Sequence, residues 1–394
     1  MNRTLTLVAS LVCLSLPLAA RQEPPAAKDA EAVTTASGLK YTVLKAGDGA
    51  KAKVGDVVRM HYTGWLTDGK KFDSSHDRGE PLFVEVGRGK VIKGWDEAIQ
   101  LMSKGQKMKL TLPPEIAYGD KGFAGAIPPK ATLVFEVELV DFAWSFQPLA
   151  AEGRKTTASG LAYQVLRPGS GATPQSAEFV SVRYAAWKPS GDLVRWSENE
   201  QQMRRTPPSI PVNVRVSSAE SPFFQEALAL TPLGGATRLE ASASQCFPAR
   251  LPPGVTSDTL ITWQFEVLDL FSAPTFSMPA PAALQKTASG LQYEVIREGS
   301  GRQPKASSRA TVHYAGWLPN GKQFDASFDG GQPATFGVGQ VIKGWTEGLQ
   351  LMKEGAIYKF VIPPELGYGA AGAPPDIPAN ATLVFYVVLI GTAG

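Results

Sequence analysis

The chain has 394 residues, which is enough for two to three domains at about 150 residues each. Its 39 lysines and arginines exceed its 36 aspartates and glutamates by only three. This balance argues against a nucleic-acid-binding protein, which would carry a clustered excess of basic residues. Hydrophobic residues make up 43% of the chain, a fraction typical of globular domains that bury a core.

The first 20 residues have the features of a secretory signal peptide. Arg3 gives a short positive start, residues 5–18 form an apolar run, and the small residues Ala19-Ala20 precede a polar, proline-rich segment. We therefore predict cleavage near Ala20 and export to the periplasm or the extracellular space. An uncleaved membrane anchor is the alternative. Cys13 does not fit a lipoprotein site, because the preceding Val12 is not small.

Cleavage would leave Cys246 as the only cysteine. We therefore expect an exported protein without an internal disulfide, although its compartment would permit one.

One sequence motif occurs three times along the chain. "TTASGLKYTVLKAGDG" (34–49) returns as "TTASGLAYQVLRPGSG" (156–171) and as "KTASGLQYEVIREGSG" (286–301). The spacing exceeds 100 residues, so the copies indicate three tandem domains and not a solenoid. Pro/Ala-containing stretches between them suit semi-rigid linkers. The expected order is a signal peptide at 1–20, a linker at 21–35, unit one at 36–142, a linker at 143–157, unit two at 158–271, a linker at 272–287 and unit three at 288–392.

Strand patterns dominate each unit. In unit one, Val58, Met60 and Tyr62 alternate with Arg59 and His61, which predicts a strand with the tyrosine on its core face. Two hairpin turns are expected, at Asp68-Gly69 and Asn320-Gly321. The last strand of unit one, 132–139, places four apolar residues on one face: Leu133, Phe135, Val137 and Leu139.

One segment of each unit departs from the strand pattern. In 94–105, Trp95, Ile99 and Met102 share one face of a short helix that we expect to end at Gly105. Unit three repeats the pattern with Trp345, Leu349, Met352 and Gly355. A strand-rich unit with one central helix is an α+β domain, an antiparallel sheet wrapped over that helix.

The common catalytic motifs do not occur in the sequence. The histidines are His61, His76 and His313, and no HExxH or CxxC spacing indicates a metal site. Unit two has Arg183 where units one and three have His61 and His313, so this position is interpreted as a polar strand face and not as a ligand. We expect no metal and no cofactor.

Aromatic residues with a single carboxylate remain as a candidate site in units one and three. From their spacing alone they fit a packed core, and an Asp directly after a core aromatic also fits an apolar pocket with a few polar groups. The residues leave both interpretations open.

Unit one closely resembles an FKBP-type peptidyl-prolyl cis-trans isomerase in the combination HYTG, KFDSS, VIKGW, PPEIAYG and IPPKATLVFEVEL. The resemblance covers essentially all of unit one and nearly all of unit three. In unit one it implies a pocket of Tyr62, Phe72, Asp73, Val91, Ile92, Trp95, Tyr118, Ile127 and Phe135. In unit three it implies a pocket of Tyr314, Phe324, Asp325, Val341, Ile342, Trp345, Tyr368, Ile377 and Phe385.

This resemblance implies rotation about X–Pro bonds in proline-containing polypeptides, and binding of the macrolide inhibitors of the family. An apolar pocket would favour the twisted amide over the polar, planar one, so neither a nucleophile nor a metal is needed. Asp73 would orient the pocket without acting as a general base. The other implied roles are Trp95 as floor, Tyr62, Phe72 and Phe135 as walls, and the Ile92 N–H and Tyr118 hydroxyl as anchors for substrate carbonyls.

Unit two keeps the scaffold pattern and departs at the site. Val194-Arg195 replace Phe-Asp, and Glu220-Ser221 replace Val-Ile. Aromatic substitutions accompany them: Phe224 for the tryptophan, Phe247 for the loop tyrosine and Trp263 for the last-strand phenylalanine. We interpret unit two as an inactive spacer or client-binding module; a weak isomerase with a reshaped pocket is the alternative.

Units one and three differ at three rim positions, where unit three has Gly330 for Arg78, Ala334 for Leu82 and Ala373 for Phe123. This difference favours two active units with different substrate preferences.

The leading hypothesis is an exported, monomeric prolyl isomerase that assists protein folding. The alternative is a non-catalytic holdase or peptide-binding protein that uses several pockets for avidity. A structural envelope protein is a third possibility, and only the tandem architecture supports it.

Overall fold

The structure is a computed structural model that describes residues 32–176, 178–203, 210–219 and 221–394. The expected signal peptide, Cys13 and Glu220 lie outside the described residues. Among the described residues, no helix is both long enough and apolar enough to cross a membrane.

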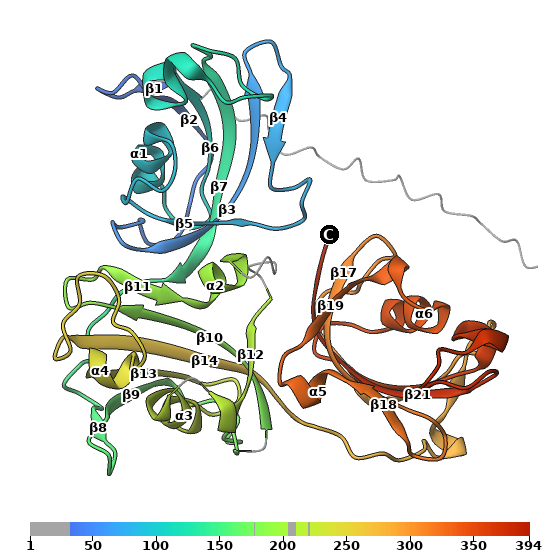
Figure 1. Ribbon diagram of the computed structural model, residues 1–394. Coiled ribbons are helices and arrows are strands. Elements are labelled where there is room, and N and C mark those ends of the chain that lie inside the picture. The colour runs from blue at the N-terminus through green and yellow to red at the C-terminus, as the bar shows by residue number, and fades with distance from the viewer. Residues whose placement is uncertain (1–31, 177, 204–209, 220) are drawn as a thin grey trace, which may run out of the picture.

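Three seven-stranded antiparallel sheets follow one another, each curved around a short helix (Figure 1). In unit one the strand order is β1-β2-β6-β7-β3-β4 with β5 paired to β3, and the other two sheets repeat this topology. The central helices α1, α3 and α6 occupy equivalent places. The α+β prediction is therefore confirmed, and units two and three add further short helices.

The element bounds in unit one are β1 Val33–Thr34, β2 Lys40–Lys45, β3 Val57–Leu66, β4 Lys71–Ser74, β5 Leu82–Glu85, α1 Lys93–Leu101, β6 Lys107–Leu112, η1 Pro114–Ile116, η2 Gly119–Lys121 and β7 Leu133–Trp144. Those in unit two are β8 Lys155–Thr156, β9 Ala162–Arg167, β10 Glu178–Trp187, β11 Leu193–Trp196, α2 Ser197–Met203, β12 Val212–Arg215, η3 Val216–Ser218, α3 Pro222–Ala229, β13 Ala236–Ser242, α4 Ala243–Cys246 and β14 Leu260–Ser272. Those after unit two are η4 Pro281–Ala283, β15 Gln285–Lys286, β16 Gln292–Arg297, β17 Arg309–Trp317, β18 Gln323–Ala326, α5 Ser327–Gly330, β19 Ala334–Gly337, η5 Val338–Gln340, α6 Lys343–Leu351, β20 Ile357–Ile362, η6 Pro364–Leu366, η7 Gly369–Ala371 and β21 Leu383–Ala393.

The strand periodicity places the expected side chains in the core. Val58, Met60 and Tyr62 of β3 are buried, and so are the four apolar residues expected on one face of the last strand. Both predicted hairpin turns form; in the first, the Gly69 N–H donates to the carbonyl of Leu66 at 3.0 Å. The resulting apolar face of each sheet covers its helix.

The central helix ends earlier than expected. Trp95 and Ile99 are buried as predicted, but α1 stops at Leu101 and not at Gly105. Met102 turns to extended backbone (ψ 151°), which keeps its side chain fully buried and lets its carbonyl accept from Ala52 at 3.1 Å. Gly105 serves instead in the turn before β6, at φ +78°. Helix α6 ends in the same way, at Leu351.

Units one and two are joined where Trp144 of unit one contacts a buried carboxylate of unit two, Glu198. The indole Nε1 of Trp144, at the end of β7, donates to Glu198 Oε2 at 2.8 Å. Arg183 donates from Nε to Oε1 of the same carboxylate at 2.8 Å, and its guanidinium lies over the Trp144 ring. Because Glu198 is 2% exposed, its charge is stabilised by these two partners and by the Ser197 hydroxyl, which donates to Oε2 at 2.9 Å.

Units two and three are joined through His313, which is fully buried. Its Nε2 lies 2.9 Å from Asn213 Oδ1 and its Nδ1 lies 2.9 Å from Ser327 Oγ. Its ring stacks on Phe328 and contacts the edge of Phe179, which belongs to unit two. The polar strand face expected here is therefore an interface between domains, where the imidazole is a hydrogen-bonding partner.

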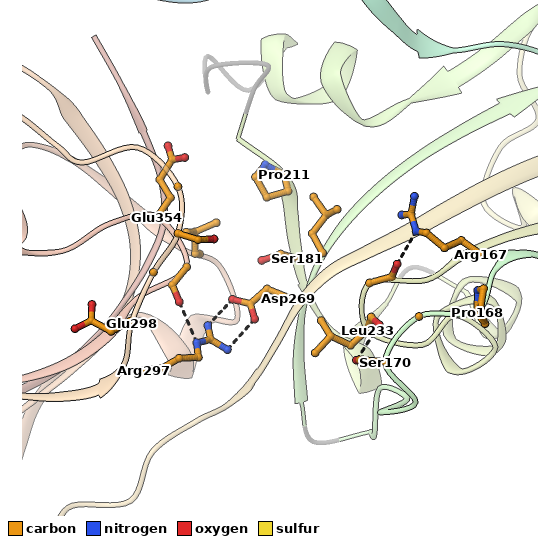
Figure 2. A pocket seen from close by; sticks show the side chains of 18 residues that line it. Arg167, Pro168, Ser170, Ser181, Pro211, Leu233, Asp269, Arg297, Glu298 and Glu354 are labelled. Carbon is orange, nitrogen blue, oxygen red and sulfur yellow. Dashed lines mark hydrogen bonds and ion pairs between the residues drawn. The ribbon is translucent and has the colours of Figure 1, made fainter.

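A cleft of about 1030 Å³ runs along the junction of units two and three (Figure 2). On its unit-three side, Arg297 donates to both carboxylate oxygens of Asp269 at 2.8 and 2.6 Å, and to the carbonyl of Gly355 at 2.9 Å. These bonds occupy the guanidinium and tie β16 to the last strand of unit two. Unit three also reaches unit one, where Arg302 pairs with Glu80 at 3.0 Å.

The stability of the junction between units two and three should depend on pH through His313. Burial, and then the nearby Arg215 guanidinium, lower the pKa of His313 to about 4 from its ordinary value of 6.5. The unfolded chain therefore binds a proton at higher pH than the folded chain, so stability is complete above pH 6.5 and is lost as the pH falls towards 4. The loss amounts to about 3 kcal/mol.

This dependence is measured by urea unfolding of the full chain at pH 7 and pH 5. H313Q should be less stable at pH 7 and should lose less stability on acidification than the wild type. H76Q removes an exposed histidine and is the matched control. Equal acid sensitivity of the wild type and H313Q would contradict the assignment.

Candidate functional site

A cavity of about 730 Å³ opens between the concave face of the unit-three sheet and the start of α6. All nine residues expected for this unit line it. The cavity also includes four residues outside that set: Phe336, Gln340, Ala373 and Asp376.

The apolar part of the cavity is built from perpendicular ring contacts. Trp345 lies with its ring edge-to-face against Tyr314 and Phe385, both at 5.2 Å between centroids. Phe324 meets Phe385 in the same way at 5.4 Å. Edge-to-face pairs fix ring orientation as well as burying area, so the cavity is held open by its own walls.

The polar part is a tyrosine–carboxylate pair. The Tyr314 hydroxyl donates to Asp325 Oδ2 at 2.6 Å. Burial, and then the Asp325 carboxylate, raise the pKa of Tyr314, so it remains a hydrogen-bond donor. The pairing of β17 with β18 places Asp325 opposite Gly316, two residues from Tyr314 along the strand.

A glycine on the long strand makes room for the two phenylalanines. A Cβ atom on Gly316 would lie 2.6 Å from Phe385 and 2.7 Å from Phe324. Gly64 of unit one is in the same position, with both contacts at 2.7 Å, to Phe72 and Phe135. Any side chain there would displace one ring.

Unit one assembles the same site. Trp95 lies 5.0 Å from Tyr62 and 5.3 Å from Phe135, and the Phe72 and Phe135 centroids are 5.5 Å apart. The Tyr62 hydroxyl donates to Asp73 Oδ2 at 2.5 Å. The remaining expected residues flank this group: Val91, Ile92 and Ile127 pack on the same core, and Tyr118 is 37% exposed at the rim.

Arg78 distinguishes unit one from unit three. It donates to Asp73 Oδ1 at 2.5 Å and to the Tyr62 hydroxyl at 2.7 Å. Burial acts to raise the pKa of Asp73, but the bonds from Tyr62 and Arg78 outweigh burial and hold it below its usual value. Burial and the Asp73 carboxylate raise the pKa of Tyr62 to about 12.

Two of the four residues missed in unit three had a signal in the sequence. Phe336 lies two residues after Ala334, so strand alternation places both on one face. Ala373 is one of the rim differences noted in the sequence. Gln340 and Asp376 lie in loops, where periodicity gives no orientation.

In unit two the equivalent space is filled by aromatic rings. Trp263 is fully buried and lies within 6 Å of Tyr184, Phe223 and Phe247 between centroids. Arg195 stands where units one and three have Asp, and its guanidinium lies over the Tyr184 ring at 5.5 Å. Cys246, the free cysteine of this unit, is buried, which raises the pKa of its thiol to about 12.

Comparison with known proteins shows which family this chain is similar to. The family model described as FKBP-type peptidyl-prolyl cis-trans isomerase matches residues 49–140 and 300–390, which fall in units one and three. A peptidyl-prolyl cis-trans isomerase of Schizosaccharomyces pombe is 52% identical over 104 residues, which are 26% of this chain and 93% of that protein. FkpA of Aeromonas hydrophila, also named an FKBP-type isomerase, is 56% identical over 107 residues, 27% of this chain and 39% of that protein.

A longer relative matches across the units. The isomerase FKBP9 of Rattus norvegicus is 30% identical over 350 residues, 85% of this chain, and this chain spans 54% of its length. The short relative is covered nearly end to end at high identity, and the same pocket is built twice in the structure. The chain therefore belongs to the FKBP-type peptidyl-prolyl cis-trans isomerase family.

Proposed function

We propose that this chain is an exported prolyl isomerase that assists the folding of proline-containing polypeptides, with catalysis in units one and three. The observation that carries the proposal is the repeated constellation of a buried tryptophan, two phenylalanines and a tyrosine–aspartate pair, which encloses a cavity of about 730 Å³ in unit three. The apolar run within residues 1–20 supports export.

Catalysis in this cavity requires no covalent step. Resonance imposes a barrier of about 18–20 kcal/mol on rotation about the X–Pro bond, and the twisted amide has lost that resonance and its polarity. A proline ring that packs on Trp345, between Phe324 and Phe385, is removed from water. Removing water disfavours the planar, polar amide more than the twisted one, so the cavity lowers the barrier.

Polar groups at the rim hold the peptide while the bond rotates. The Ile342 N–H at the start of α6 and the Tyr368 hydroxyl, whose residue is 43% exposed, serve as donors for substrate carbonyls. Asp325 orients Tyr314 and influences the rotating carbonyl electrostatically. Ile92, Tyr118 and Asp73 take these roles in unit one.

Unit two acts as a structural adaptor. Ala186 stands opposite Trp263 on the neighbouring strand, where the active units have Gly64 and Gly316. Its methyl group takes the space that a wall phenylalanine needs, which explains why Val194 is smaller. The space is closed by Trp263, while Glu198 of the same unit holds Trp144 of unit one.

Removing both carboxylates should reduce isomerase activity. We expect D73A/D325A in the full chain to lower kcat/KM in a cis-to-trans peptide assay by about tenfold, equivalent to about 1.4 kcal/mol. Each single variant should keep the isomerase activity of the unit that is not mutated. E347Q removes a half-buried carboxylate on α6 that accepts from the Ser289 hydroxyl away from the cavity, and it should leave kcat/KM unchanged. A wild-type chain that bound peptide without accelerating isomerisation would leave only the holdase interpretation.

Restoring Phe-Asp in unit two should destabilise it without creating activity. In V194F/R195D the new ring meets the Ala186 methyl group, and we expect a loss of about 1–3 kcal/mol in unfolding free energy. Adding A186G should recover most of that loss. Both variants are made in the D73A/D325A background and measured by urea unfolding and by the peptide assay. A gain of isomerase activity in V194F/R195D would show that this pocket is not closed.

A further inference from the structure

The rims of the two pockets differ in charge next to the pocket carboxylate. In unit one, Arg78 contacts Asp73 directly and offsets its charge. Unit three has Gly330 at this place, and Asp325 is an exposed residue bonded to the Tyr314 hydroxyl.

The strand that carries the carboxylate shows the same difference. Lys71 of unit one pairs with Asp77 at 2.8 Å. In unit three the lysine is replaced by Gln323, whose amide donates to Asp329 at 2.8 Å. The carboxylate is kept and its cation is lost.

Two loops at the pocket mouth also carry a less positive charge in unit three than in unit one. Residues Arg88–Lys90 separate Gly87 from Val91 in unit one, whereas Gln340 alone stands between Gly339 and Val341. Gln340 lines the cavity.

The loop that carries the pocket isoleucine adds an acid in unit three. Asp376 precedes Ile377 and lines the cavity, where unit one has Ala126 before Ile127. Asp376 lies 3.4 Å from Lys322, but both side chains are more than half exposed, so this pair offsets little of the charge.

We propose that the two pockets select X–Pro segments of opposite charge: unit one takes segments with an acidic residue beside the proline, and unit three takes segments with a basic one. This inference rests on the proposed isomerase function. At Lys71, Arg78, Lys90 and Ala126 the change to unit three subtracts a positive charge three times and adds a negative charge once. An apolar cavity beside these groups weakens solvent screening of a substrate charge at the rim.

The experiment uses the full chain with one pocket disabled at a time. F324V/D325A leaves unit one as the active unit, and F72V/D73A leaves unit three. The substrates are three tetrapeptides that differ only in the residue before proline, which is Glu, Leu or Lys. A second series places the same residues after the proline.

The chain with unit one active should have a five- to tenfold higher kcat/KM for the Glu peptide than for the Lys peptide, and the chain with unit three active should show the reverse. R78G/K90Q in the first chain and G330R/D376A in the second should move each ratio towards that of the other unit. The rim variants should change kcat/KM for the Leu peptide less than for the Glu and Lys peptides, and E347Q should leave both ratios unchanged. Raising the salt concentration to 0.5 M, well above physiological ionic strength, should reduce both ratios.

The outcomes separate this inference from the function on which it rests. If neither chain accelerates the Leu peptide, the isomerase proposal itself fails. If both chains turn over the Leu peptide but share one Glu-to-Lys ratio in both series, the charge selection is wrong. If the rim variants change kcat/KM equally for all three peptides, these residues support the structure of the pocket. That outcome would also overturn the charge selection.

Discussion

The pocket depends on one steric constraint, the absence of a side chain at Gly64 and Gly316. The antiparallel register of the long strand with the last strand sets each glycine opposite a wall phenylalanine, Phe135 or Phe385. Only with a hydrogen there can a second phenylalanine from the neighbouring hairpin reach the first. In unit two the methyl group of Ala186 removes that space. The hydrogen atom at this position is therefore what lets the two phenylalanine rings meet in units one and three.

Sequence periodicity was sufficient for the frame of unit one because buried and less buried residues alternate along most of β3 and the first part of β7. Tyr62 on β3 and Trp95 on α1 are buried as their spacing predicts. Helix ends were less predictable: Met102 leaves the helix to satisfy a backbone bond from Ala52, which lies fifty residues away in sequence. Buried contacts between domains left no local pattern either, so His313 was interpreted as part of an ordinary polar strand face. The aromatic set alone fitted a core as well as a pocket, and the resemblance to a known family was needed to favour the pocket.

Units two and three each dock on the preceding unit through residues at equivalent positions. Glu198 and Phe328 occupy the same place after the hairpin strand in units two and three, and each contacts the preceding unit. Arg183 and His313 occupy the same place on the long strand and support those contacts. The outer face of the hairpin is therefore a docking surface, while its inner face builds the pocket. The two roles lie on opposite sides of one element, so either can change without loss of the other.

Unit two shows how the inner and outer faces of the hairpin can differ from those of the other units. On the inner face its hairpin carries Arg195 over Tyr184 where units one and three have an aspartate, so the pocket carboxylate is absent there. On the outer face it carries Glu198, a buried acid that binds Trp144 and Arg183. An unpaired carboxylate would be costly at that depth, but donors from two different units satisfy it. The negative charge of this hairpin thus lies on the outer face of unit two, where it stabilises the contact with unit one.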